Sequence, residues 1–235
     1  MPTGPDWNSY ERYLVVVAHP DDAEFSSAGT IALLTAAGKH VVITQVTSGD
    51  KGTSDPLVAT THMMTTRESE ELEAARRLGV ASVDFLRQTD GELMPDLKLR
   101  GEIVRSVRRH RPDVIITHDP FRAYAFHPDH RAVGLSAHDS AYPSARDPHA
   151  YSEQLTEGLE PHKTAEVWYF NAEFPDLIVD ITKTMENKID SLRAHLSQVG
   201  TTDEVWDRVR DRAREVANEH PFEYGEAYKV VQLRR

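Results

Sequence analysis

The chain alternates between short apolar runs and stretches whose apolar residues recur at helical spacing. Residues 13–19 (YLVVVAH) and 40–49 (HVVITQVTSG) are rich in β-branched side chains and end in turn-forming residues, as strands do. Between them, residues 24–38 (EFSSAGTIALLTAAG) show helical spacing and end at a glycine. This pattern predicts a β–α–β unit with two parallel strands.

The same alternation continues along the chain. Helical patterns occupy residues 65–80 and 96–110, and strand patterns occupy residues 83–86 and 113–120. They are followed by two further strands, at 165–171 and 176–182, by two helices between about 182 and 219, and by an edge strand near 227–233. We therefore predict the α/β class: a Rossmann-like, mostly parallel sheet with helices on both faces. A single domain is expected over residues 1–235, with a core from about 13 to 233.

Composition narrows the possible functions. The formal charge of −11 opposes binding to nucleic acid or to anionic lipid. The chain has no cysteine, so any metal must be held by His, Asp or Glu. No segment has the pattern of a secretory signal or the apolar length of a membrane span. We expect a cytoplasmic protein that neither binds nucleic acid nor inserts into a membrane.

Two clusters of ionisable residues follow predicted strand ends. HPDD (19–22) comes directly after the first strand, where an X-Pro turn and a helix cap would explain it equally well. HPDH (127–130) follows the strand at 113–120. Because the carboxyl ends of parallel strands share one edge of a sheet, we expect the clusters to meet there. Two histidines and one carboxylate match a catalytic zinc site with a fourth position for water, although spacing alone leaves open whether Asp21 or Asp22 is the ligand.

The two motifs, in this order of strands, resemble the LmbE/PIG-L family of metal-dependent sugar N-deacetylases. The likeness covers most of residues 13–233 and includes AHPDDAE, TSGDKG, TRESEELEAARRLG, TDGEL, RRHRPDVIITHDP, HPDH and DITKTMENKIDSLRAHLSQ. The resemblance implies one Zn²⁺ per chain, with Fe²⁺ as the other candidate, held by His19, Asp22 and His130. It also implies a small-molecule N-acyl amino sugar or a glycoconjugate as substrate, and a homo-oligomer.

The resemblance also assigns roles to residues around the metal. Asp21 would be the general base, His127 would face the oxyanion, and Asp129 would hold the His127 ring. Arg67 and Asp90 would contact the substrate. The roles agree with amide hydrolysis, which needs a base for the attacking water and a donor for the charge that develops on the carbonyl oxygen.

Other ionisable residues favour structural interpretations. Glu24 lies where a carboxylate suits a helix start, and RSVRRHR (105–111) is interpreted as a solvated helix end. His195 is interpreted as a packing or hydrogen-bonded histidine. The polar stretches 49–61 and 142–164 are expected to form the substrate rim.

Two other functions remain open. A non-haem iron(II) oxygenase also uses two histidines and one carboxylate. Asp21 beside the ligand favours hydrolysis, and the alternation of strands and helices differs from the β-barrels typical of those oxygenases. The third hypothesis is a sugar-binding relative that has lost its activity. The presence of all the implied metal and catalytic side chains of the two motifs argues against it.

Overall fold

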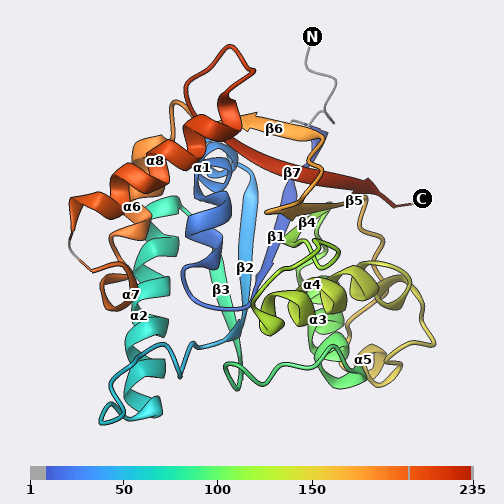
Figure 1. The fold of residues 1–235 in the computed structure, drawn as a ribbon. Coiled ribbons are helices and arrows are strands. Elements are labelled where there is room, and N and C mark those ends of the chain that lie inside the picture. Colours follow the sequence, from blue (N-terminus) through green and yellow to red (C-terminus); the bar gives the residue numbers. More distant parts are fainter. Residues whose placement is uncertain (1–8, 201, 234–235) are drawn as a thin grey trace.

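A computed structural model describes residues 9–200 and 202–233; the remaining residues of the expected 1–235 domain lie outside the described residues. The described chain forms one seven-stranded sheet in the order β3-β2-β1-β4-β5-β7-β6 (Figure 1). The strands are β1 (Arg12–Val17), β2 (His40–Thr47), β3 (Ser82–Gln88), β4 (Val114–His118), β5 (Glu166–Phe170), β6 (Leu177–Asp180) and β7 (Gly225–Gln232). Strands β1 to β5 are parallel, so the predicted α/β class is confirmed.

Helices cover both faces of the sheet (Figure 1). The helices are α1 (Asp22–Ala36), α2 (Thr60–Leu78), α3 (Leu97–His110), α4 (Pro128–Ala141), α5 (Glu153–Thr156), α6 (Met185–Leu192), α7 (Leu196–Val199) and α8 (Asp203–Ala217). Side chains of α1, α2, α6 and α8 share one core, and those of α3 and α4 share the other. In β1, Val15 and Val17 belong to the first core, whereas Leu14 and Val16 belong to the second. The unbroken apolar run of β1 thus reflects burial on both sides.

The chain changes direction in the sheet at β1. It leaves β1 through α1 toward β2 and β3, and it returns to the other side of β1 with β4. In an open α/β sheet, this topological switch creates a crevice beyond the carboxyl ends of the two central strands. The segments after β1 and β4, which carry HPDD and HPDH, both open into it.

The C-terminal part differs from the prediction. β7 is not an edge strand, because it lies between β5 and β6 and is antiparallel to both. Among the described residues after 182 there are three helices rather than two, since the short α7 separates α6 from α8. Strand character can be read locally, whereas the neighbours of a strand depend on contacts distant in sequence. No helix among the described residues is long and apolar enough to cross a membrane.

Arg108 contradicts the prediction of a solvated helix end. Its side chain is only 2% exposed, and it donates hydrogen bonds to the carbonyl oxygens of Ala150 (2.7 Å), Asp147 (2.9 Å) and Tyr151 (3.0 Å). These contacts hold part of the 142–164 segment against α3. Among the described residues that line the cavity at HPDD and HPDH, none comes from 142–164. The expectation that this segment forms the substrate rim is therefore wrong for that cavity.

Candidate active site

The HPDD turn directs its two aspartates to different partners. Asp21 has a left-handed backbone, with φ of 102°, which costs energy for a residue other than glycine. Its Oδ2 lies 3.1 Å from Nη2 of Arg67. Asp22 begins α1 and accepts a hydrogen bond from the backbone N–H of His19 at 2.7 Å. The adjacent carboxylates therefore occupy separate surroundings.

His19, Asp22 and His130 converge. Nδ1 of His19 lies 3.2 Å from Nε2 of His130 and 3.4 Å from Oδ2 of Asp22, and His130 Nε2 lies 3.2 Å from Asp22 Oδ1. Donor atoms bound tetrahedrally to zinc at about 2.0–2.1 Å lie roughly 3.3 Å from one another. The spacing of these three donors therefore suits a small divalent ion, and no donor needs to move far to bind it.

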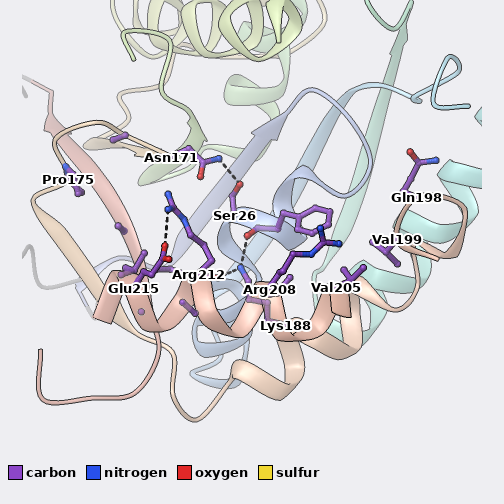
Figure 2. Close-up of a pocket in the computed structure, with 18 of the residues that line it drawn as sticks. Ser26, Asn171, Pro175, Lys188, Gln198, Val199, Val205, Arg208, Arg212 and Glu215 are labelled. Carbon is purple, nitrogen blue, oxygen red and sulfur yellow. Dashed lines mark hydrogen bonds and ion pairs between the residues drawn. The ribbon is translucent and has the colours of Figure 1, made fainter. Parts of the chain in front are cut away.

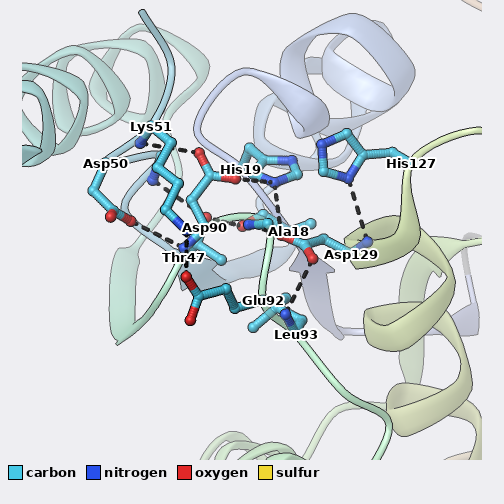
Figure 3. A network of polar contacts seen from close by, with 12 residues as sticks. Ala18, His19, Thr47, Asp50, Lys51, Asp90, Glu92, Leu93, His127 and Asp129 are labelled. Atoms are coloured by element: carbon cyan, nitrogen blue, oxygen red, sulfur yellow. Dashed lines mark hydrogen bonds and ion pairs between the residues drawn. The ribbon is translucent and has the colours of Figure 1, made fainter. Parts of the chain in front are cut away.

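The field at His19 favours positive charge. Its second nitrogen, Nε2, lies 3.1 Å from Asp90 Oδ1 and 3.2 Å from Asp129 Oδ2 (Figure 3). Burial disfavours the imidazolium, but hydrogen bonds to Asp129, Asp22 and Asp90 outweigh burial and raise the pKa of His19 to about 12. A site with three carboxylates around one imidazole can balance a divalent cation, so the donor set fits a metal in charge as well as in spacing.

The carboxylate of Asp129 does not hold the His127 ring. Instead, besides contacting His19, it accepts hydrogen bonds from the backbone N–H groups of Gly91 (2.7 Å) and Leu93 (3.2 Å). Its contact with His127 comes from its backbone, because the Asp129 N–H donates to Nδ1 of His127 at 3.3 Å. The reason is that His127 caps the start of α4, whereas Asp129 lies in the first helical turn with its side chain fully buried.

Asp90 also lies behind His19. Its Oδ1 contacts Nε2 of His19, and its Oδ2 accepts a hydrogen bond from the backbone N–H of Lys51 at 3.3 Å (Figure 3). The side chain nevertheless lines the cavity, as the predicted substrate role requires. Asp90 thus joins the metal-facing histidine to the 49–52 segment.

Arg67 braces Asp21. Its guanidinium is buried and donates to the Asp21 carboxylate and to the carbonyl oxygen of Pro20. Burial, together with the charge of Asp22, raises the pKa of Asp21 to about 7 despite the opposing charge of Arg67. Gly49 makes room for Arg67, since a Cβ on Gly49 would lie 2.2 Å from Nη1 of Arg67.

His118 is a site residue that the sequence interpretation missed. It ends β4, and its Nε2 lies 3.3 Å from Asp22 Oδ2 and accepts a hydrogen bond from the Ala18 N–H at 3.2 Å. Its ring stacks on that of His130, with centroids 4.2 Å apart. Burial lowers the pKa of His118. A histidine at the end of a strand, in THDP, was the available signal.

A second buried cluster lies beside Arg67. Nε2 of His195 lies 3.4 Å from Glu24 Oε2 and 3.9 Å from Glu71 Oε2, and all three side chains are fully buried. Within the described residues, their carboxylate oxygens and ring nitrogens have no partner with good hydrogen-bond geometry. Glu24 lies in the first turn of α1, as predicted, and its side chain is fully buried. His195 is packed in the interior, which agrees with the packing interpretation rather than the hydrogen-bonded one.

The crevice forms a cavity of about 450 Å³, which we call the metal cavity. Its lining contains most of the predicted site: His19, Asp21, Asp22, Lys51, Gly52, Arg67, Asp90, Gly91, His127 and His130. Asp129 lies in the wall behind it. The structure thus brings all eight predicted site residues into or directly behind one cavity.

Comparison with known proteins gives a consistent result. The PIG-L family model, described as GlcNAc-PI de-N-acetylase, matches residues 14–141. The chain is 34% identical to diacetylchitobiose deacetylase of Thermococcus kodakarensis, over 90% of this chain and 78% of that protein. It is 28% identical to 1D-myo-inositol 2-acetamido-2-deoxy-alpha-D-glucopyranoside deacetylase of Mycobacteroides abscessus, over 82% and 83% of the two chains.

A solved structure agrees over nearly the whole length. The N,N'-diacetylchitobiose deacetylase from Pyrococcus horikoshii, complexed with its inhibitor MPG, matches 99% of this chain and 87% of its own, with a TM-score of 0.91 and 30% identity. The match in sequence and in structure thus agrees with the features described above, which are the sheet order, the two motifs at its switch point and the cavity between them. The chain belongs to the PIG-L (GlcNAc-PI de-N-acetylase-like) family.

Proposed function

We propose that the protein is a zinc-dependent N-deacetylase that removes an acetyl or other N-acyl group from a glucosamine-like sugar in a small molecule or a glycoconjugate. The observation that carries the proposal is the convergence of His19, Asp22 and His130 within 3.4 Å of one another, with Asp21 lining the same cavity. The relatives support it, since those compared above are deacetylases of N-acetylated amino sugars by name.

His19 Nδ1, Asp22 and His130 Nε2 would hold one metal ion per chain. When bound, zinc supplies a Lewis acid for the amide carbonyl and lowers the pKa of bound water. The same donors suit Fe²⁺, which is the second candidate. Asp129 and Asp90 orient His19 by contacting its other nitrogen, an arrangement that fixes the tautomer of a ligating histidine.

Asp21 is the proposed general base. Its carboxylate is separate from the three ligand atoms and is oriented by Arg67. From this position it would accept the proton of the attacking water and later deliver a proton to the leaving amine. The left-handed backbone at Asp21 gives it this direction, away from Asp22.

His127 is the proposed donor to the developing oxyanion. Its Nδ1 accepts the Asp129 N–H, so a neutral ring carries its proton on Nε2. Burial, with the nearby His19 and His130, lowers the pKa of His127, which favours this neutral form. Because the side chain lines the metal cavity, its N–H can stabilise the charge on the former carbonyl oxygen.

Arg67 and Asp90 are proposed to contact the sugar, because both line the cavity. In Arg67, Nη2 already donates to both Asp21 and the Pro20 carbonyl oxygen, so orienting the base is its first role. Homo-oligomerisation and a cytoplasmic location stay predictions.

The test is chelation followed by restoration. Protein dialysed against a chelator should release no acetate from N-acetylglucosamine or N,N'-diacetylchitobiose, and added zinc should restore release. Fe²⁺ with oxygen is the control for the oxygenase hypothesis, which requires oxygen consumption without acetate release. If zinc-loaded protein releases nothing from a broad panel of N-acyl sugars, the inactive binding protein becomes the better hypothesis.

A further inference from the structure

A larger cavity, of about 840 Å³, lies between α1, α7, α8 and the segment after β5 (Figure 2). We call it the outer cavity. Its volume falls in the range of about 300–1,000 Å³ that is typical of small-molecule sites. None of the catalytic or metal-holding roles above uses its residues.

Residues that line the outer cavity lie next to residues of the metal cavity at two places. Phe25, which lines the outer cavity, follows the ligand Asp22 by three residues on α1, so the two lie about one helical turn apart. On the other side, Nε2 of Gln198 in the outer cavity donates a hydrogen bond of 3.0 Å to the carbonyl oxygen of Gly52, which lines the metal cavity. The linings of the two cavities therefore adjoin on α1 and at Gly52.

The lining of the outer cavity suits a polar ring compound. Phe25 is 43% exposed, so an aromatic face is available to the apolar C–H face of a sugar. Ser26 and Asn171, joined by a hydrogen bond of 3.1 Å, and the exposed Arg208 add polar groups for hydroxyls (Figure 2). Val205 and Val209 add apolar surface to the same lining. Aromatic and aliphatic surface with a few fixed polar groups is typical of a small-molecule site.

The backbone of α1 at Phe25 is held in place by a buried ion pair. The ammonium group of the buried Lys188 donates to the Phe25 carbonyl oxygen at 2.8 Å and pairs with Glu226 at 2.6 Å. These contacts fix the backbone that carries the Phe25 ring, so less backbone freedom is lost when a ligand packs against it.

We propose that the outer cavity binds the part of an N-acyl saccharide that lies beyond the sugar being deacylated, a second sugar ring or a comparable polar group, with Phe25 as its packing surface. This inference rests on the proposed deacetylase function. It makes the protein selective for substrates larger than a monosaccharide.

The first test compares two substrates in zinc-loaded protein. Phe25→Ala should lower kcat/KM for N,N'-diacetylchitobiose about tenfold, equivalent to about 1.4 kcal/mol, and should change that for N-acetylglucosamine less than twofold. Arg208→Ala, on the exposed face of α8, should act in the same direction without disturbing the core. Phe174→Ala is the matched control, since Phe174 is exposed but does not line the cavity. Equal losses for both substrates, or no loss for the disaccharide, would overturn the inference.

The second test separates this inference from the proposed function. The dissociation constants of both sugars are measured by calorimetry for zinc-loaded Asp21→Asn protein, with and without Phe25→Ala. A roughly tenfold weakening for the disaccharide alone supports the outer cavity even if the parent protein releases no acetate. An unchanged disaccharide constant rejects the outer cavity even if deacetylation is observed.

Discussion

Oδ2 of Asp129 lies 3.2 Å from Nε2 of His19, although 110 residues separate the two in sequence. The contact places a fully buried carboxylate directly behind the histidine whose other nitrogen faces Asp22 and His130. Carboxylate partners of this kind orient a ligating imidazole and raise its basicity. Asp129 is therefore expected to act on the metal rather than on His127.

Asp129→Asn should weaken zinc binding by about 10–100-fold, because an amide holds the His19 tautomer less firmly. His127→Ala is the matched comparison and should keep the metal while lowering kcat. Both are measured by zinc titration against a competing chelator and by steady-state kinetics. Full zinc affinity in Asp129→Asn would show that its contact with His19 does not support the metal.

Asp21 and Asp22 are expected to fail in different ways when each is changed to asparagine. Asp22→Asn should lose zinc, because the neutral amide is a poorer ligand and removes one charge from the site. Asp21→Asn should keep zinc and substrate binding but lower kcat by about 10²–10⁴-fold, the usual contribution of a general base. Metal analysis and kinetics on the same preparations separate the roles. Loss of zinc from Asp21→Asn alone would reverse the assignment.

Gly49→Ala should reduce activity through Arg67. Gly49 has φ of 61°, and a Cβ there would lie 2.2 Å from Nη1 of Arg67, which is buried against Asp21. Gly38→Ala is the control, because Gly38 has φ of 78° but no atom within 4 Å of the added Cβ. Gly38→Ala should cost about 1–2 kcal/mol of stability and leave kcat/KM unchanged. Gly49→Ala should have a similar cost in stability and should in addition lower kcat/KM at least tenfold. Equal activities in the two variants would contradict this role of Arg67.

Glu71 should make stability depend on pH. Burial, with repulsion from Glu24, raises the pKa of Glu71 well above its usual value of 4.5. A carboxyl group with a raised pKa in the folded state destabilises the fold above its unfolded pKa, so the penalty should grow as pH rises from about 4.5. The size of this penalty also depends on the nearby charges of His195, Asp21 and Asp22.

Glu71→Gln removes this penalty and should raise Tm at pH 8 by about 2–4 °C, which corresponds to about 1 kcal/mol in a domain of this size. The gain should shrink toward pH 5, and Glu219→Gln, at an exposed position, should show none. Thermal unfolding of the three proteins across this range is the measurement. A gain of the same size at pH 5 and pH 8 would mean that ionisation of Glu71 is not its cause.

The sequence by itself determined the elements and the location of the chemistry. Residues 13–17 are apolar on both faces and the helices have clear periodicity, so local pattern was enough to predict strands alternating with helices. HPDD and HPDH directly follow two strands, and parallel strands share one carboxyl edge, so their meeting could be predicted without coordinates. The distances among His19, Asp22 and His130 agree with that expectation.

Only the tertiary structure decided which partners each side chain contacts. Asp129 lies near His127 in sequence, yet its carboxylate contacts His19, because the first turn of α4 buries that side chain toward the segment after β3. Arg108 looked like one solvated cation among several until its carbonyl partners, 36 or more residues away, were placed around it. Periodicity reports which face of an element is buried, but contacts between elements depend on how the whole chain packs. For that reason sequence alone could locate the site but could not assign its supporting residues.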